Sequence, residues 1–236
     1  MTEVEFNSLI VKVGYLETAL RGWLVACFFI AGPRVRKSPV ITPLFWWAAG
    51  IFLISVLELA FITAVNTYPD FFVPYLDRFN IHNTFFTSPL FYLTGILGLG
   101  IFFSRAIGGS TGKFVFVVSF TLAVAEILNS LFGEGFREAQ KIGSAGMALF
   151  KIILCVLFFR KNFIKGVDKS LKDDALNLIV WGIFSISSLT ILVLLFSNSL
   201  YSGFTILFYQ ISLGRMIIEM LGILLIGYGV RKFRIR

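Results

Sequence analysis

Long apolar runs, separated by short polar stretches, dominate this sequence. A helix needs roughly 20 predominantly apolar residues to cross the hydrocarbon core of a bilayer. The pattern predicts seven such spans, at about residues 11–31, 41–66, 86–104, 114–133, 142–159, 175–197 and 203–230. We therefore expect residues 1–236 to form a single integral membrane domain, an all-α polytopic transmembrane helix bundle.

The first span is the least regular, because Lys12, Glu17 and Arg21 interrupt it. A segment of this kind can cross the membrane, or it can lie at the interface as an amphipathic helix. The sequence leaves both interpretations open. The acidic N-terminus, which no small-residue cleavage site follows, does not predict a removable signal peptide.

Composition agrees with a membrane protein. Of the 236 residues, 57% are hydrophobic and 14% are charged, whereas soluble domains are about 25% charged. The net charge of +8 does not indicate nucleic-acid binding, because most basic residues lie in short loops beside apolar runs. That placement is typical of orientation signals.

Basic residues alternate between the two sides of the predicted spans. Loops 32–40, 105–113 and 160–174 and the tail 231–236 hold 14 lysines and arginines, against 3 on the other side. This asymmetry predicts an external N-terminus and a cytoplasmic C-terminus. The expected location is a bacterial cytoplasmic (inner) membrane. Anionic lipid headgroups are the first expected partner of the basic loops, and a separate membrane or cytoplasmic protein is the second.

Aromatic residues mark both ends of the second span. Trp46 and Trp47 indicate an anchor at its inner end, and loop 67–85 beyond its outer end contains four phenylalanines. We expect this loop to lie against the outer bilayer surface. A lid that contacts a ligand is the alternative.

Catalytic motifs are incomplete. The segment 108–113 lacks the first glycine and the final Ser or Thr of a phosphate-binding loop. Gly143-Ser144-Ala145-Gly146 resembles the serine segment of rhomboid proteases, but His82, the one histidine, lies in a loop. Cys27 and Cys155 lie within apolar spans without metal-ligand spacing. We therefore expect no enzyme activity, cofactor or metal site; a lipid-modifying enzyme remains a minor alternative.

Charged residues within the spans are the informative feature. Arg21, Lys151 and Arg215 fall near mid-membrane, and four carboxylates lie within about two helical turns of it: Glu17, Glu58, Glu126 and Glu219. Each costs roughly 2.5–3.5 kcal/mol to insert at a helix centre. Unpaired, the seven would cost on the order of 20 kcal/mol, so they must face one another or water.

Spacing indicates partners within this charged layer. Glu17 with Arg21, and Arg215 with Glu219, are four residues apart and share helix faces. Glu126 and Lys151 lie at similar depth on consecutive spans and could bridge them. Glu58 is left as a surplus carboxylate. Asn129, Asn177 and Gln210 could extend the network.

Two interpretations follow. The ion pairs could only fix helix packing, or the layer could line a polar cavity in which a carboxylate titrates or a cation or polar ligand binds. The second interpretation makes a ligand- or ion-binding site of Glu58, Glu126, Lys151, Arg215 and Glu219, with Glu17 and Arg21 as a secondary charge pair.

Three short motifs stand out within the predicted spans and at their ends: Phe-Tyr-Leu-Thr at 91–94, Gly133-Glu134-Gly135 and Trp181-Gly182-Ile183. In these motifs and in its layout, the chain resembles small seven-helix bacterial membrane proteins and the seven-helix sensory regions of some membrane histidine kinases. The resemblance covers about residues 40–230. It carries over no functional residue and implies a sensor whose output lies on a separate protein. The expected function is thus a non-enzymatic receptor-like protein or an accessory subunit of a membrane complex. A small-solute or proton-coupled transporter or channel is the alternative.

Overall fold

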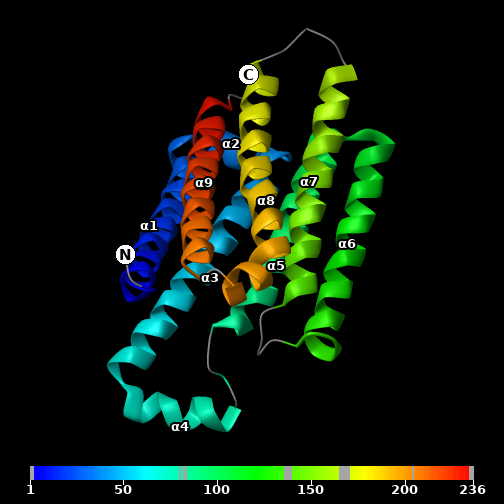
Figure 1. Cartoon of the computed structure of the whole chain (residues 1–236). Helices are drawn as coiled ribbons and strands as arrows, with labels where there is room; N and C mark the ends of the chain where they lie inside the picture. Colours follow the sequence, from blue (N-terminus) through cyan, green and yellow to red (C-terminus); the bar gives the residue numbers. More distant parts are fainter. Residues whose placement is uncertain are drawn as a thin grey trace.

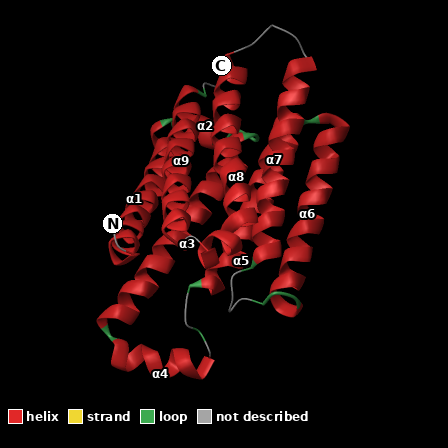
Figure 2. Ribbon diagram, viewed as in Figure 1, coloured by secondary structure: helices red, strands yellow, loops and turns green. Residues whose placement is uncertain are grey.

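The computed structural model describes residues 3–79, 81, 84–135, 140–164, 171–203 and 205–233. Within these residues the regular structure is entirely helical (Figure 2). The elements are α1 (Glu3–Ile30), α2 (Pro33–Arg36), α3 (Ile41–Thr67), α4 (Pro69–Phe79), the 3-10 turn η1 (Phe85–Thr87), α5 (Ser88–Ile107), α6 (Gly109–Phe132), α7 (Lys141–Ile164), α8 (Leu171–Gly203) and α9 (Thr205–Lys232).

Seven of these helices are long and apolar enough to cross a membrane. They are α1, α3, α5, α6, α7, α8 and α9, and each overlaps one predicted span, with ends that differ from the prediction by up to eight residues. The all-α class and the seven helices are therefore confirmed for the described part of the chain. These features are those of an integral membrane protein.

Six of the long helices form a closed ring. α1 packs against α3, α3 against α5, α5 against α7, α7 against α8, α8 against α9, and α9 returns to α1. The seventh, α6, packs mainly against the outside of α5 and touches α7 only slightly. Figure 1 shows α6 at the edge of the bundle. The helices α5 and α7 therefore separate a side chain on α6 from the centre of the ring.

The first helix belongs to the ring. It packs against α3 and α9 and runs alongside the other long helices (Figure 1). An amphipathic helix at the membrane surface would lie across the bundle instead. The arrangement thus favours the spanning interpretation of the first segment.

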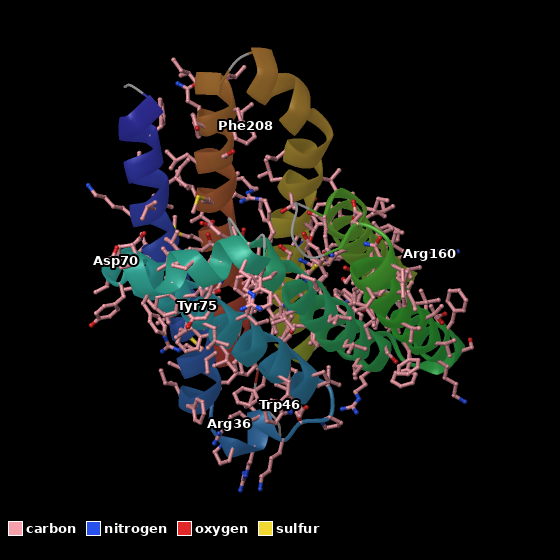
Figure 3. The ribbon with its side chains drawn as sticks, turned by 90° about the horizontal axis from the view of Figure 1, so that it is seen from below. Arg36, Trp46, Asp70, Tyr75, Arg160 and Phe208 are labelled. Carbon is pink, nitrogen blue, oxygen red and sulfur yellow. The ribbon has the colours of Figure 1, made fainter. Side chains whose placement is uncertain are left out.

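The predicted loop 67–85 contains a helix, which the sequence analysis missed. α4 begins at Pro69, where proline's fixed φ suits a first turn. Seen from below, α4 crosses in front of the bundle and carries Asp70 and Tyr75 (Figure 3). Its Phe71, Tyr75 and Phe79 are all exposed and stand four residues apart on one face. We call this end of the bundle the α4 end.

The opposite end, which carries α2, is filled by apolar side chains. The rings of Phe102 and Phe103 of α5 pack edge to face, and Phe103 packs in the same way against Phe158 of α7. All three are less than 2% exposed. Nearer the α2 end, Lys161 of α7 donates a hydrogen bond to the carbonyl of Ile107 at the end of α5. The α2 end of the ring is therefore closed.

Candidate functional site

Arg21 ties three ring helices together. Its guanidinium donates hydrogen bonds to Glu17 on the same helix and to Ser55 on α3. Its Nη2 also donates to Glu219 Oε1 of α9, at 3.0 Å. The predicted Glu17–Arg21 pair is therefore present, and Arg21 extends it to a second carboxylate that spacing along one helix could not indicate.

Most of this cluster is withdrawn from solvent. The side chains of Glu17, Arg21 and Glu219 are 10%, 16% and 21% exposed. A buried charge is tolerated where ion pairs and hydrogen bonds replace its lost hydration. Glu219 also lies within electrostatic range of Arg215 and Lys151, so three cations act on one carboxylate, of which Arg21 alone contacts it directly.

A cavity of about 630 Å³ lies inside the ring. All six ring helices and η1 contribute to its wall, whereas α6 does not. Its lining extends to Thr84 and Phe85 at the α4 end and to Trp47 near the start of α3. Six charged side chains line it: Glu17, Arg21, Glu58, Lys151, Arg215 and Glu219. The cavity wall is therefore formally neutral, with three cations and three carboxylates.

Several polar groups of the wall have no hydrogen-bond partner among the described residues. Arg21 Nε, Arg215 Nε and Trp47 Nε1 are buried donors without a hydrogen bond to the described residues. Lys151 and Glu58 likewise make no hydrogen bond and no ion pair within 4.0 Å with another described residue. A buried donor without an acceptor costs about 1–3 kcal/mol, so these groups call for water or a ligand.

Trp47 corrects one prediction. Trp46 and Trp47 were both expected to anchor the membrane interface, but Trp46 is 65% exposed and Trp47 is 5% exposed. Adjacent residues on a helix point about 100° apart, so only one of the two can face outward. Trp47 instead packs against Gly98 of α5 and lines the cavity.

Glu126 corrects a second prediction. It lies on α6, outside the ring, and does not line the cavity. Its expected ion pair with Lys151 is not formed. Its Oε1 instead accepts a hydrogen bond from Ser130 at 3.2 Å, and Gln140 donates to Ser130 at 3.1 Å. Gly143 of α7 packs against its carboxylate. The reason is the edge position of α6, which keeps this carboxylate away from the central cations.

The remaining expected contacts are also different. Arg215 and Glu219 share a helix face but form no ion pair within 4.0 Å, because Glu219 binds Arg21 instead. Asn129 pairs with Glu134, which caps the start of α7. Asn177 pairs with Asn162 near the α2 end, and Gln210 is exposed. None of these three amides extends the charged layer.

Ser55 and Trp47 are the site residues that sequence reasoning missed. Ser55 stands three residues before Glu58, one helical turn away on α3, and that spacing was the available signal. The described residues contain no cluster of three His, Cys, Asp or Glu side chains that could hold a metal ion. His82 lies outside the described residues, as do Arg137, Lys165, Lys169, Arg234 and Arg236 of the charge asymmetry.

Comparisons with protein-family models, with curated proteins and with solved structures found no match to this chain. The resemblance to seven-helix sensory regions therefore rests on the sequence motifs alone. The regular structure of the described residues is all-helical, and seven of these helices are long and apolar enough to cross a membrane.

Proposed function

We propose that this protein is a non-enzymatic membrane receptor, or a receptor-like accessory subunit, that binds a small polar molecule in the cavity of the six-helix ring. The observation that carries the proposal is the set of partnerless polar groups around that cavity. Ligand sites typically measure about 300–1,000 Å³ and combine apolar walls with a few placed polar groups. The 630 Å³ cavity has both properties.

Closure of one end favours binding over passage. Buried phenylalanines fill the ring between the charged layer and the α2 end, and hydrated solutes do not pass a dry apolar core. A ligand held by α1, α3, α7 and α9 would change the packing of helices that reach both ends of the bundle. A signal could leave by that route to a separate membrane or cytoplasmic protein.

Orientation belongs to the proposal. The α2 end carries the basic residues Arg34, Arg36, Lys113, Arg231 and Lys232. We assign this end to the cytoplasm of a bacterial cell, facing anionic headgroups, and the α4 end to the outside. Single cysteines introduced in place of Ser110 and Asp70 test this with a membrane-impermeant maleimide. External labelling of Asp70→Cys alone is expected; labelling of Ser110→Cys alone reverses the assignment.

Ligand-dependent stability tests the binding proposal. The protein in nanodiscs would be heated with a library of small polar metabolites, beside a Lys151→Met variant. A ligand at 100 times its Kd stabilises the folded state by about 2.7 kcal/mol. We expect at least one compound to raise the Tm of the wild type and to lose that effect in the variant. Stabilisation by no compound would count against the proposal.

Proton-coupled transport is the second candidate, and one contact favours it. Glu17 and Glu219 both accept a hydrogen bond from Nη2 of Arg21, and intramembrane carboxylates gathered in this way are typical of proton relays. Flux measured in proteoliposomes under a pH gradient tests this. Loss of flux in Glu219→Gln with retention in Glu126→Gln would support transport through the ring. Absence of flux in the wild type would remove the candidate.

A further inference from the structure

Arg36 of α2 lies over the ring of Phe29, at the end of α1. Its guanidinium carbon is 4.3 Å from the centre of that ring, which is a cation–π contact. Nε of Arg36 is buried without a hydrogen-bond partner, and the guanidinium forms no ion pair within 4.0 Å with a described residue. The ring covers one face of the guanidinium and leaves its N–H edges, which are the groups that bind anions.

The segment that carries Arg36 is fixed by contacts with the bundle. Its neighbour Val35 is 5% exposed. The carbonyl of Arg36 accepts a hydrogen bond from Thr42 at 2.7 Å, and the carbonyl of Pro39 accepts one from Arg105 of α5 at 2.6 Å. A group held in place in this way loses little conformational freedom when a ligand binds.

Three aromatic rings continue from this contact along α1 and α3. The ring centres of Phe29 and Phe45 are 5.9 Å apart, and those of Phe45 and Trp46 are 5.3 Å apart. Phe45 also packs on the fully buried Phe28, which joins these rings to the core. Phe29 and Trp46 are 55% and 65% exposed. Arg36 and Trp46 lie at the same corner of the bundle (Figure 3). We call Phe29, Phe45 and Trp46 the aromatic strip.

Arg36 and the aromatic strip lie at different depths. Phe29 is the last residue but one of the apolar span Leu9–Ile30, and Trp46 follows the start of the span Ile41–Thr67 by five residues. A rise of 1.5 Å per residue places Trp46 about 7 Å inside that span. Arg36 lies in the connection between the two spans. Arg36 is therefore at the level of lipid headgroups, and the strip extends from there into the region of the acyl chains.

The charge around Arg36 is positive. Arg34, Arg36 and Lys37 lie within four positions, and the sequence contains no Asp or Glu from residue 18 to residue 57. A phosphate group suits the guanidinium, because two parallel N–H groups can donate to two of its oxygens. A zwitterionic headgroup would also bring its own ammonium beside three cations. A headgroup with a net negative charge avoids that repulsion.

We infer that Arg36 and the aromatic strip bind one anionic phospholipid, whose phosphate contacts Arg36 and whose acyl chain lies along Phe29, Phe45 and Trp46. The inference goes beyond the proposed function, because none of these residues lines the cavity. It also goes beyond a general attraction between basic loops and anionic headgroups, since it places one lipid at one site. A lipid bound there would bridge α1 and α3.

Quenching of tryptophan fluorescence by brominated lipids tests the site. The full-length protein in nanodiscs with brominated phosphatidylglycerol is compared with the same protein in brominated phosphatidylcholine, with identical acyl chains. The part of the quenching that Trp46→Phe removes reports on the aromatic strip. We expect phosphatidylglycerol to occupy this place roughly fivefold or more in preference to phosphatidylcholine.

Variants of two basic residues separate a site from a diffuse positive surface. Arg36→Gln should abolish the preference for phosphatidylglycerol. Arg36→Lys keeps the charge but loses the planar pair of N–H donors and the stacking, so it should lose most of the preference. Arg34→Gln removes the same charge from the same short helix and should retain most of it. Unchanged quenching by brominated phosphatidylcholine shows that each variant is folded in the bilayer.

A second pair of variants tests the strip. Phe29→Leu should weaken the preference, because the ring that holds the guanidinium is lost. Phe114→Leu is the matched control, since Phe114 is 66% exposed and lies at the same end of the bundle on α6. It should leave the preference unchanged.

The contrary outcomes are distinct. Equal quenching by the two lipids in the wild type overturns the inference. Equal losses in Arg34→Gln and Arg36→Gln, or a full preference in Arg36→Lys, would mean diffuse attraction and overturn it as well. Displacement of the brominated phosphatidylglycerol by inorganic phosphate would show an anion site without a role for the acyl chain, which also overturns the lipid assignment. The receptor proposal depends on the cavity and is unaffected by all of these results.

Discussion

Glu219 and Glu126 are both glutamates in membrane-spanning helices, yet their surroundings differ completely. Glu219 of α9 faces the inside of the ring, binds Arg21 at 3.0 Å and lies in range of Arg215 and Lys151. Glu126 of α6 is 6% exposed and has Ser130 as its hydrogen-bond donor, with no cation within 4.0 Å among the described residues. One carboxylate belongs to a charge cluster beside a cavity, and the other to a neutral packing contact.

The difference shows that depth in the membrane does not decide the role of a buried carboxylate. Whether the helix of a buried carboxylate belongs to the ring decides which groups that carboxylate contacts. Charges on ring helices converge on a shared space, where each can be balanced by several others. A carboxylate on the outer helix finds only the groups of its immediate neighbours, here a hydroxyl and the backbone near Gly143.

Removal of the shared cation should have the largest effect. Arg21→Met would leave Glu17 and Glu219 buried without their direct partner, at a cost of about 3–5 kcal/mol. The apparent free energy of unfolding, from SDS titration in mixed micelles, measures the loss. Adding Glu17→Gln and Glu219→Gln should restore part of it, because neutral amides need no cation. An Arg21→Met variant with the free energy of unfolding of the wild type would show that the cluster contributes nothing to the stability of the fold.

The second largest effect is expected when the two carboxylates, Glu219 and Glu126, are each replaced by glutamine. Glu219→Gln should lower the free energy of unfolding by about 2 kcal/mol, because it removes a charge-assisted hydrogen bond to Arg21. Glu126→Gln should change it by less than about 1 kcal/mol, since no charged partner is lost and the amide oxygen still accepts from Ser130. The same titration gives both values. Equal losses would contradict the distinction between the ring and the outer helix.

Substitution of Gly143, which packs closely against Glu126, should have a smaller effect on stability. A Cβ atom at Gly143 would meet Glu126 Oε2 at 2.9 Å and Tyr92 Cδ2 at 3.1 Å. Gly143→Ala should therefore destabilise the protein by about 1–2 kcal/mol through overpacking. Gly146→Ala, on the same helix with nothing within 4 Å of its Cβ position, is the control. A thermal-shift measurement with the same loss for both variants would argue against close packing at Gly143.

The smallest expected change concerns the hydroxyl beside Glu126. Ser130 donates to Glu126 and accepts from Gln140. Hydrogen bonds between side chains in membrane proteins contribute about 0.6 kcal/mol on average, so Ser130→Ala should lower the free energy of unfolding by about that amount. Ser185→Ala, which removes a hydroxyl bonded to its own helix backbone, provides the baseline. A loss above about 2 kcal/mol would mean that Glu126 is charged and dependent on this donor.

Much of the charged layer could be predicted from the sequence, but its pairing could not. The contact between Glu17 and Arg21 follows from a spacing of four on one helix. The contact between Arg21 and Glu219 joins residues 198 positions apart, and it depends on α1 and α9 being neighbours in the ring. Glu126 and Lys151 were expected to pair because their helices are consecutive. Consecutive helices are not always close partners, and α6 turns away to pack on α5.

By itself the sequence determined the spans, the all-helical class and the need for buried charges to gather. These depend on local composition, since about 20 apolar residues require lipid and an isolated ion cannot remain in it. Only the tertiary structure decided which helices close the ring, that Trp47 faces the cavity and that Glu126 does not. Those choices depend on the order and rotation of whole helices, which arise from packing summed over many side chains.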